Sequence, residues 1–75
     1  MLKITDVEYI KEFELLLTFN DGKVKRVDLK DKLNGSIFEP LKDRRNFIQF
    51  GLIHGTIEWS CGADVAPEYL YEIGE

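Results

Sequence analysis

The sequence predicts a small single α+β domain over residues 1–75, built mainly from antiparallel strands in two hairpins, with short helices. Two turn sequences support the hairpins, because Asn20-Asp21-Gly22 and His54-Gly55 each separate two stretches of strand-forming residues. A closing helix is supported by Pro67, which suits a first helical position. A chain of 75 residues, 44% of them hydrophobic, can bury one core, so we expect no second domain.

The first hairpin is predicted from hydrophobic alternation. In Phe13 to Phe19 every odd position is apolar, which gives one hydrophobic face and makes this segment the central strand of the predicted sheet. Leu2 to Tyr9 alternates imperfectly, because its apolar residues change parity in the middle. A bulge near Thr5 and Asp6 would bring them to one face. The two segments therefore predict the first two strands of an antiparallel sheet.

The next strand covers residues 23–29, and its register follows from which pairing buries apolar side chains. A two-residue turn would place charged residues on the buried face. A three-residue loop, with Gly22 in the left-handed region, instead pairs Leu15 with Val27. We therefore predict the three-residue loop, which places Lys25 at the rim, where its ammonium group can reach water.

The segment between the hairpins is predicted from its helix signals. Lys30 to Leu33 is long enough for one helical turn, and Asn34-Gly35 supplies a left-handed stop after it. Residues 36–41 are predicted to form a non-helical connector, because Pro40 disfavours the helical conformation at the residue before it. The apolar side chains of this connector are expected to dock on the sheet, and they belong to Ile37, Phe38 and Leu41.

A short helix is predicted through residues 44–47, with Asp43 as its N-cap. Phe47 would face the core, and Arg44 and Arg45 would face water. Together with Lys42 these arginines form the only dense basic cluster in the sequence. Arg44 and Arg45 are binding candidates for nucleic acid, although three cations on one short helix are more often a solvated face.

The second hairpin joins residues 50–53 to residues 56–59 through the two-residue turn His54-Gly55. This register pairs Phe50 with Trp59, and it places Ile57 with its partner on the same side of the ribbon. Trp59 is therefore predicted to be a core aromatic rather than an exposed stacking platform, because large aromatic side chains dominate core burial.

After a turn at Gly62, the chain is predicted to end in a helix that covers Trp59. Pro67 fits the first helical position, and Glu68 lies near the positive end of the helix dipole. Leu70 can contact the apolar residue before the helix as a hydrophobic staple. The residues with predicted structural roles are therefore Trp59, Gly22, Gly62, Pro67 and Leu70.

The composition restricts the classes of function. A net charge of −4 disfavours direct nucleic-acid binding and suits a basic protein partner. One Cys and one His exclude an internal disulfide and disfavour a dedicated metal site, and we expect no cofactor. The amino terminus has no signal-peptide pattern and no apolar run reaches the length of a membrane span, so we expect a cytoplasmic protein without membrane association.

Asp64 is the acidic residue best placed for a site, because a carboxylate after a tight turn could act as an acid or base or bind a basic side chain. Alternatively, Asp64 caps the turn and the last helix by accepting from main-chain amides, which is the commoner use of Asp there. Glu68, like Glu72 and Glu75, suits either a solvated helix or a contact for a basic partner. Cys61 and His54 should lie at opposite ends of one strand, about 20 Å apart. We therefore expect an inert thiol beside the core and a solvated turn histidine, and assign no catalytic residue.

A family resemblance is carried by four stretches, which read Phe19-Asn20-Asp21-Gly22, Asp28-Leu29, Phe38-Glu39-Pro40-Leu41 and Ile57-x-Trp59-x-x-Gly62-Ala63-Asp64-Val65-x-Pro67-Glu68-x-Leu70-Tyr71. With them the chain resembles, over nearly its whole length, the bacterial family called domain of unknown function 2442. The resemblance implies a small α+β domain. Members look like single-domain proteins or like the first half of a chain that adds a helix-turn-helix DNA-binding domain. Some are encoded beside another small protein, in arrangements suggestive of toxin–antitoxin pairs.

The chain departs from this family pattern at two points. It ends at Glu75, so we expect no DNA-reading half, and it has Ser60-Cys61 where the family usually shows Pro-Asn. The first departure removes autonomous DNA binding from what the resemblance implies. The second leaves the geometry of the turn before Gly62 open.

These observations predict a non-enzymatic cytoplasmic protein-interaction domain, the regulatory or antitoxin-like member of a small two-protein system. The prediction rests on the missing catalytic set and on family analogy. Two alternatives remain open. One is a small-ligand-binding or catalytic module that uses Asp64 near the Gly62 turn. The other is a self-associating structural domain joined through a strand edge.

Overall fold

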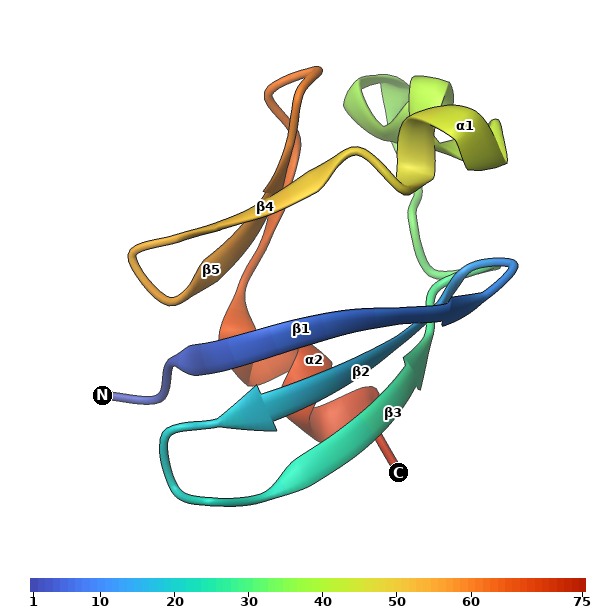
Figure 1. Ribbon diagram of the computed structural model, residues 1–75. Helices are drawn as coiled ribbons and strands as arrows, with labels where there is room; N and C mark the ends of the chain where they lie inside the picture. Colours follow the sequence, from blue (N-terminus) through green and yellow to red (C-terminus); the bar gives the residue numbers. More distant parts are fainter.

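The computed structural model, which describes residues 1–75, contains two three-stranded antiparallel sheets (Figure 1). The strand orders are β1-β2-β3 and β4-β5-β6. This architecture confirms the predicted α+β class with antiparallel strands and short helices. In chain order the elements are β1 (Ile4–Lys11), β2 (Glu14–Phe19), β3 (Val24–Asp28), the 3-10 helix η1 (Ser36–Lys42), α1 (Arg44–Phe47), β4 (Phe50–Ile53), β5 (Thr56–Trp59), β6 (Asp64–Val65) and α2 (Pro67–Ile73).

The first sheet has the predicted register. Leu15 lies opposite Val27, and the Phe19 amide donates to the carbonyl of Lys23 at 2.8 Å. Gly22 has a φ of +89°, the left-handed conformation that the three-residue loop requires. The pairing of β1 with β2 shifts after Ile4, which is the predicted bulge. These features place the apolar face of all three strands on the same side.

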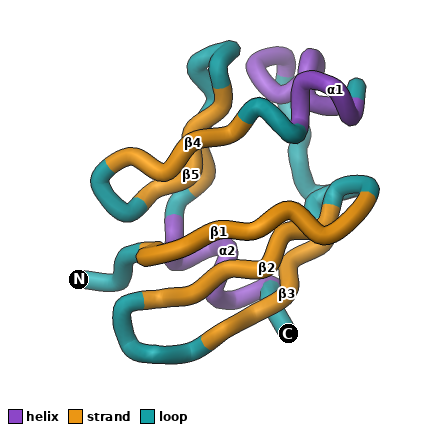
Figure 2. The backbone as a smooth tube through the Cα atoms, viewed as in Figure 1, coloured by secondary structure: helices purple, strands orange, loops and turns teal.

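Lys25 differs from its predicted position, because it lies against α2 rather than at an open rim. Its Nζ donates to the carbonyl oxygen of Tyr71 at 3.0 Å and lies 4.2 Å from the centroid of the Tyr71 ring. The same ring packs edge-on against Phe19, with 4.9 Å between centroids. Residues of β2 and β3 therefore contact the last turn of α2, which lies beside the first sheet (Figure 2).

Two predictions for the segment between the sheets are wrong. The predicted helical turn is absent: residues 30–32 form a turn in which the Lys32 amide donates to the Leu29 carbonyl at 3.2 Å. A single helical turn repays little of the cost of helix nucleation. The predicted non-helical connector is the 3-10 helix η1, which includes Pro40. Pro40 supplies no donor, but its carbonyl accepts from the Asn46 side chain at 2.8 Å.

The apolar residues of η1 dock only in part. Leu41 is buried and Phe38 is half-buried, but Ile37 is 53% exposed. The expectation that all three contact the sheet is therefore wrong for Ile37. A 3-10 helix repeats every three residues, so Phe38 and Leu41 share one face while Ile37 lies off it.

The short helix α1 forms as predicted. Asp43 accepts from the Arg45 amide at 2.9 Å, which makes it the N-cap. Phe47 is fully buried, and its ring contacts those of Tyr9 and Phe13 edge-on. This helix therefore brings one aromatic side chain from the connector onto the face of the first sheet.

The second hairpin has the predicted pairs, Phe50 with Trp59 and Leu52 with Ile57. His54 and Gly55 both have positive φ, which is the geometry of a type I′ turn. The tip of this hairpin rests on β1, where the Ile4 amide donates to the Gly55 carbonyl at 2.9 Å. This bond joins the two sheets at one end.

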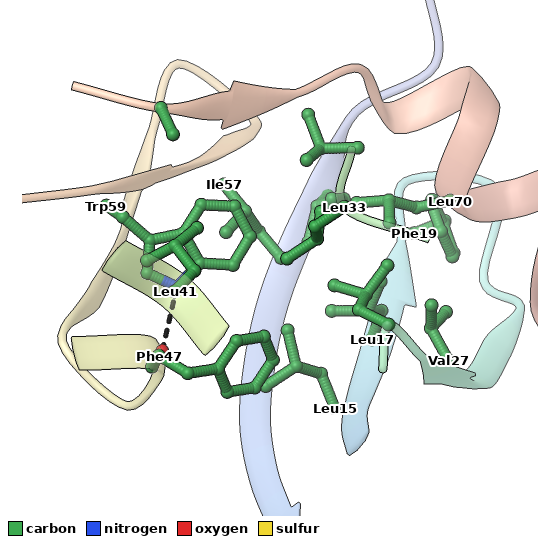
Figure 3. Packing of buried hydrophobic residues seen from close by; sticks show 14 residues of the cluster. Leu15, Leu17, Phe19, Val27, Leu33, Leu41, Phe47, Ile57, Trp59 and Leu70 are labelled. Atoms are coloured by element: carbon green, nitrogen blue, oxygen red, sulfur yellow. Dashed lines mark hydrogen bonds between the residues drawn. The ribbon is translucent and has the colours of Figure 1, made fainter. Parts of the chain in front are cut away.

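The core lies between the two sheets and contains only hydrophobic residues (Figure 3). Trp59 is 2% exposed, which confirms its predicted role, and its Nε1 donates to the carbonyl of Phe47 at 2.7 Å. α2 begins at Pro67 and ends before Gly74, as predicted. The buried residues are Ile4, Leu15, Leu17, Phe19, Val27, Leu29, Leu33, Leu41, Phe47, Ile57, Trp59, Ala63, Val65 and Leu70.

We expect Trp59→Ala to lower the free energy of unfolding by about 3–5 kcal/mol, because it leaves a cavity and removes the donor to Phe47. Trp59→Phe keeps most of the ring but leaves the buried carbonyl unpaired, so its loss should be smaller, about 1–3 kcal/mol. Urea unfolding followed by circular dichroism measures both values. A Trp59→Ala protein as stable as the wild type would contradict the core position of this side chain.

The two glycines of the second hairpin should respond differently to substitution. Gly55→Ala forces a β-carbon to within 2.7 Å of the Lys3 β-carbon at a φ of +78°, so it should lower the melting temperature. Gly51→Ala is the matched control, since its added β-carbon would meet only the Glu58 carbonyl oxygen at 4.0 Å. Equal melting temperatures for the two variants would contradict the hairpin geometry.

Candidate interaction surface

The two residues that could form a nucleophile and base pair lie apart. His54 is in the turn before β5, and Cys61 follows the other end of that strand. Both are exposed, and the thiol of Cys61 contacts the Ile37 carbonyl, with 3.8 Å from sulfur to oxygen. Cys61 is therefore on the surface rather than packed beside the core as expected. The arrangement brings no base to this thiol.

Asp64 lies on β6, one of the two edge strands of the second sheet, and is exposed. The predicted cap is wrong, because α2 has Ala66 at its N-cap and no side-chain cap bond. The reason is that Asp64 has the extended conformation of β6, which directs its side chain out of the sheet. Glu68, in the first turn of α2, is also exposed.

The basic cluster of the connector is neutralised locally. Arg45 forms an ion pair with Asp43 at 2.9 Å, and Lys42 forms one with Glu39 at 3.1 Å. Arg44 lies 3.9 Å from a carboxylate oxygen of Glu12. These pairs leave little net positive potential for nucleic acid, which favours the solvated-face interpretation of Arg44 and Arg45.

The Asp43 and Asp21 carboxylates have shifted pKa values for local reasons. The Arg45 side chain and amide donate to Asp43 and hold the pKa of that carboxyl below its usual value of 3.8. At Asp21, the Lys23 amide and the Tyr71 hydroxyl donate and lower the pKa in the same way. The bond to Asp21 also raises the pKa of the Tyr71 hydroxyl above 10.0. Both carboxylates have structural partners, which explains the shifts without a catalytic role.

Charge is divided unevenly along the chain. All 10 Lys and Arg residues lie within residues 1–45, and residues 46–75 contain neither. The second sheet and α2 are therefore built from a segment that has carboxylates but no cations apart from a His. The acidic residues of this segment are Glu58, Asp64, Glu68, Glu72 and Glu75.

Two of these carboxylates face each other on the outer side of the second sheet. Glu58 lies opposite Asp64 on β6 and opposite Gly51 on β4. Neighbouring positions on β5, Ile57 and Trp59, point into the core, so Glu58 points away from it. Neither carboxylate takes part in an ion pair. Like charges directly opposite each other destabilise a sheet, so this pair is unexplained by the fold.

Three hollows mark the surface. One of about 240 Å³ lies beside the connector over Phe13, Leu33 and Leu41. A polar one of about 520 Å³ lies between β3 and the last residues, beside Arg26 and Glu75. The third, of about 260 Å³, lies over Gly51 with Glu58 in its wall. Asp64 lines none of them, so no hollow supports the alternative of a small-ligand site at this residue.

Sequence reasoning selected Asp64 and Glu68 but passed over Glu58 and Gly51. The signal for Glu58 was present, since it lies between two residues predicted to face inward. Its register against Asp64 depends on the turn at Gly62, whose geometry the sequence leaves open.

No helix of the structure combines the length and the apolar character that a membrane crossing requires.

We expect Tyr71→Phe to raise the pKa of Asp21 toward 3.8, because one of its donors is lost, while the pKa of Asp43 stays unchanged. The folded pKa of Asp21 is lowered, so its stabilising contribution is present above the unfolded pKa and is lost as pH falls through the folded value. Tyr71→Phe should therefore flatten the loss of stability below about pH 4. An NMR titration of the carboxyl groups measures both pKa values, and an unchanged Asp21 would contradict the bond.

Comparison with known proteins gives one match. A family model described as "Protein of unknown function (DUF2442)" matches residues 4–75. No curated protein and no solved structure shows a significant match. The match covers both sheets and all helices. It includes the acidic face, by which we mean the outer side of the second sheet with Glu58 and Asp64.

Proposed function

The chain belongs to the DUF2442 family, and on this premise we propose that it is a non-enzymatic cytoplasmic domain that binds another protein. The observation that carries the proposal is the uneven charge: the second sheet and α2 present carboxylates with no Lys or Arg among them. A surface of one sign attracts and orients a partner of the opposite sign. The proposed partner is therefore a basic protein.

Exposed apolar side chains in the same part of the chain support the same function. Ile53 on β4 is 46% exposed, and Leu52, Ile48 and Tyr69 are exposed to a similar degree. Interfaces commonly combine an apolar centre with a charged rim. A purely electrostatic attraction to a polyanion or membrane would need the opposite charge and would not need these side chains.

The proposed biological role is that of a regulatory, antitoxin-like member of a small two-protein system. This role is supported by the family resemblance alone, since some members of the family are encoded beside another small protein. It is also supported by the placement of His54 and Cys61 at opposite ends of β5, which favours binding over catalysis. A catalytic or ligand-binding role for Asp64 has less support, because this residue is exposed and lines no hollow.

Self-association is a second candidate, and the strand order favours it. β4 is the outermost strand of its sheet, so its outer main-chain groups have no ladder partner. A second copy could pair with that edge. The acidic face opposes this arrangement, since two copies would bring like charges together.

We expect the chain to form a complex of fixed stoichiometry with the product of the neighbouring gene when the two are produced together. Size-exclusion chromatography with light scattering measures the mass. The complex should weaken as salt is raised from about 0.1 M to 1 M, because screening shortens the reach of surface charges. A homodimer that excludes the neighbour's product would favour self-association, and a monomer in every mixture would contradict the proposal.

A further inference from the structure

Gly51 occupies the middle of β4 without a conformational reason. Its φ is not in the left-handed region, and an added β-carbon would lie 4.0 Å from its one neighbour, the Glu58 carbonyl oxygen, which is ordinary contact. Glycine weakens a strand interior and often marks a place where another chain approaches closely. The fold itself would accept a side chain at this position, so the space over Gly51 is free for something else.

The hollow of about 260 Å³ lies over this glycine. Main-chain and apolar atoms of β4 and β5 contribute to its lining, with Ile53 on one side, and the carboxylate-bearing Glu58 forms part of the wall. Gln49 and Ser60 add polar groups at one end. An apolar surface that leads to a carboxylate suits a Lys or Arg side chain, because the aliphatic stem packs on the apolar part and the cation reaches the acid.

Glu58 and Asp64 supply two negative charges for one such cation. They occupy opposite positions on adjacent antiparallel strands, where β-carbons are about 5 Å apart. No Lys or Arg of the same sheet is available to neutralise them. A cation from outside would convert their repulsion into attraction.

The edge of β4 can hold the main chain of the same partner. Because the hairpin turn has two residues, Ile53 and Thr56 form a hydrogen-bonded pair, and the main-chain groups of Phe50 and Leu52 point away from β5. β1 approaches this edge at the hairpin tip, where Ile4 bonds to Gly55. The Phe50 end remains unpaired in the sheet, next to the hollow.

We propose that the outer face of β4-β5-β6 binds an extended basic segment of the partner protein, with one Lys or Arg side chain lying over Gly51 and its cation between Glu58 and Asp64. The inference rests on the proposed function and names its site. The segment adds to the Phe50 end of β4 as a strand, in the manner of β-augmentation. Specificity comes from the missing side chain at Gly51. The partner's cationic side chain can lie across this position, and a larger residue at position 51 would block it.

A peptide probe tests the site directly. The full chain, labelled with ¹⁵N, is titrated with an acetylated peptide of about eight residues in which Val alternates with Lys and Arg. The matched control has Glu at the basic positions. We expect the basic peptide to shift the amide signals of β4 and of Glu58, and the acidic peptide to shift none. Absence of shifts at β4 with the basic peptide, or shifts confined to α2, overturns the proposal.

Two variants sharpen this test. Gly51→Leu fills the hollow, and Glu58→Gln removes the charge without changing the shape of the side chain much. Each should weaken peptide binding by about tenfold or more. Asp31→Asn, in the turn after β3, removes one negative charge outside the second sheet and α2 and should leave binding unchanged. If Gly51→Leu is poorly folded by circular dichroism, Glu58→Gln alone decides, and wild-type affinity in that variant overturns the proposal.

The same variants separate this inference from the proposed function. If the neighbour's product binds the wild type and binds Gly51→Leu and Glu58→Gln equally well, the domain binds a protein at another site and the inference is wrong. If the wild type binds no neighbour but binds the basic peptide at β4, the site stands and the two-protein pairing is wrong. Loss of the neighbour's binding in both variants, with Asp31→Asn unaffected, supports both.

Discussion

The hydrogen bond from the Trp59 indole to the Phe47 carbonyl is the contact on which the rest of the structure depends. It lies within the core and joins the connector between the sheets to the second hairpin. The carbonyl belongs to a residue whose ring contacts the first sheet through Tyr9 on β1. One residue of α1 therefore touches both sheets, through its ring on one side and its main chain on the other. In a chain of 75 residues, where a single core has little stability in excess, such a shared contact aligns two sheets that have few main-chain bonds between them.

The strands could be predicted because their evidence is local. The first sheet was predicted from the odd-numbered apolar residues between Phe13 and Phe19, and the second hairpin from the turn at His54-Gly55. The start of α1 was predicted from Asp43. The 3-10 helix could not be predicted, since Pro40 argues against a helix unless the docking of Leu41 on the core is known. Lys25 was placed correctly in its strand but wrongly in its surroundings, because α2 lies beside it only in the folded chain. Local signals thus specified the elements, while contacts between distant elements decided the rest.

The acidic face was only half visible in the sequence. Asp64 stood out because it follows a turn, but its significance comes from Glu58 on the neighbouring strand and from the bare glycine beyond it. Neither residue is notable by itself. Their alignment depends on two registers. The His54-Gly55 turn sets the register of β4 with β5, and the Gly62 turn sets that of β5 with β6. A search for reactive side chains passes over such a surface, because its chemistry is that of shape and charge rather than of a nucleophile.

The position of Lys25 under the last turn of α2 has a consequence for how the chain can be divided. α2 has no basic residue in its own last turn, where a cation would complement the helix dipole. The ammonium group at the Tyr71 carbonyl comes instead from β3, in the half of the chain that contains every Lys and Arg. The cation that neutralises the end of α2 therefore comes from residues 1–45 rather than from the acidic segment 46–75. A fragment cut between the two would lose not only half of its core but also the electrostatic neutralisation of its terminal helix, so the halves are interdependent parts of one cooperative unit.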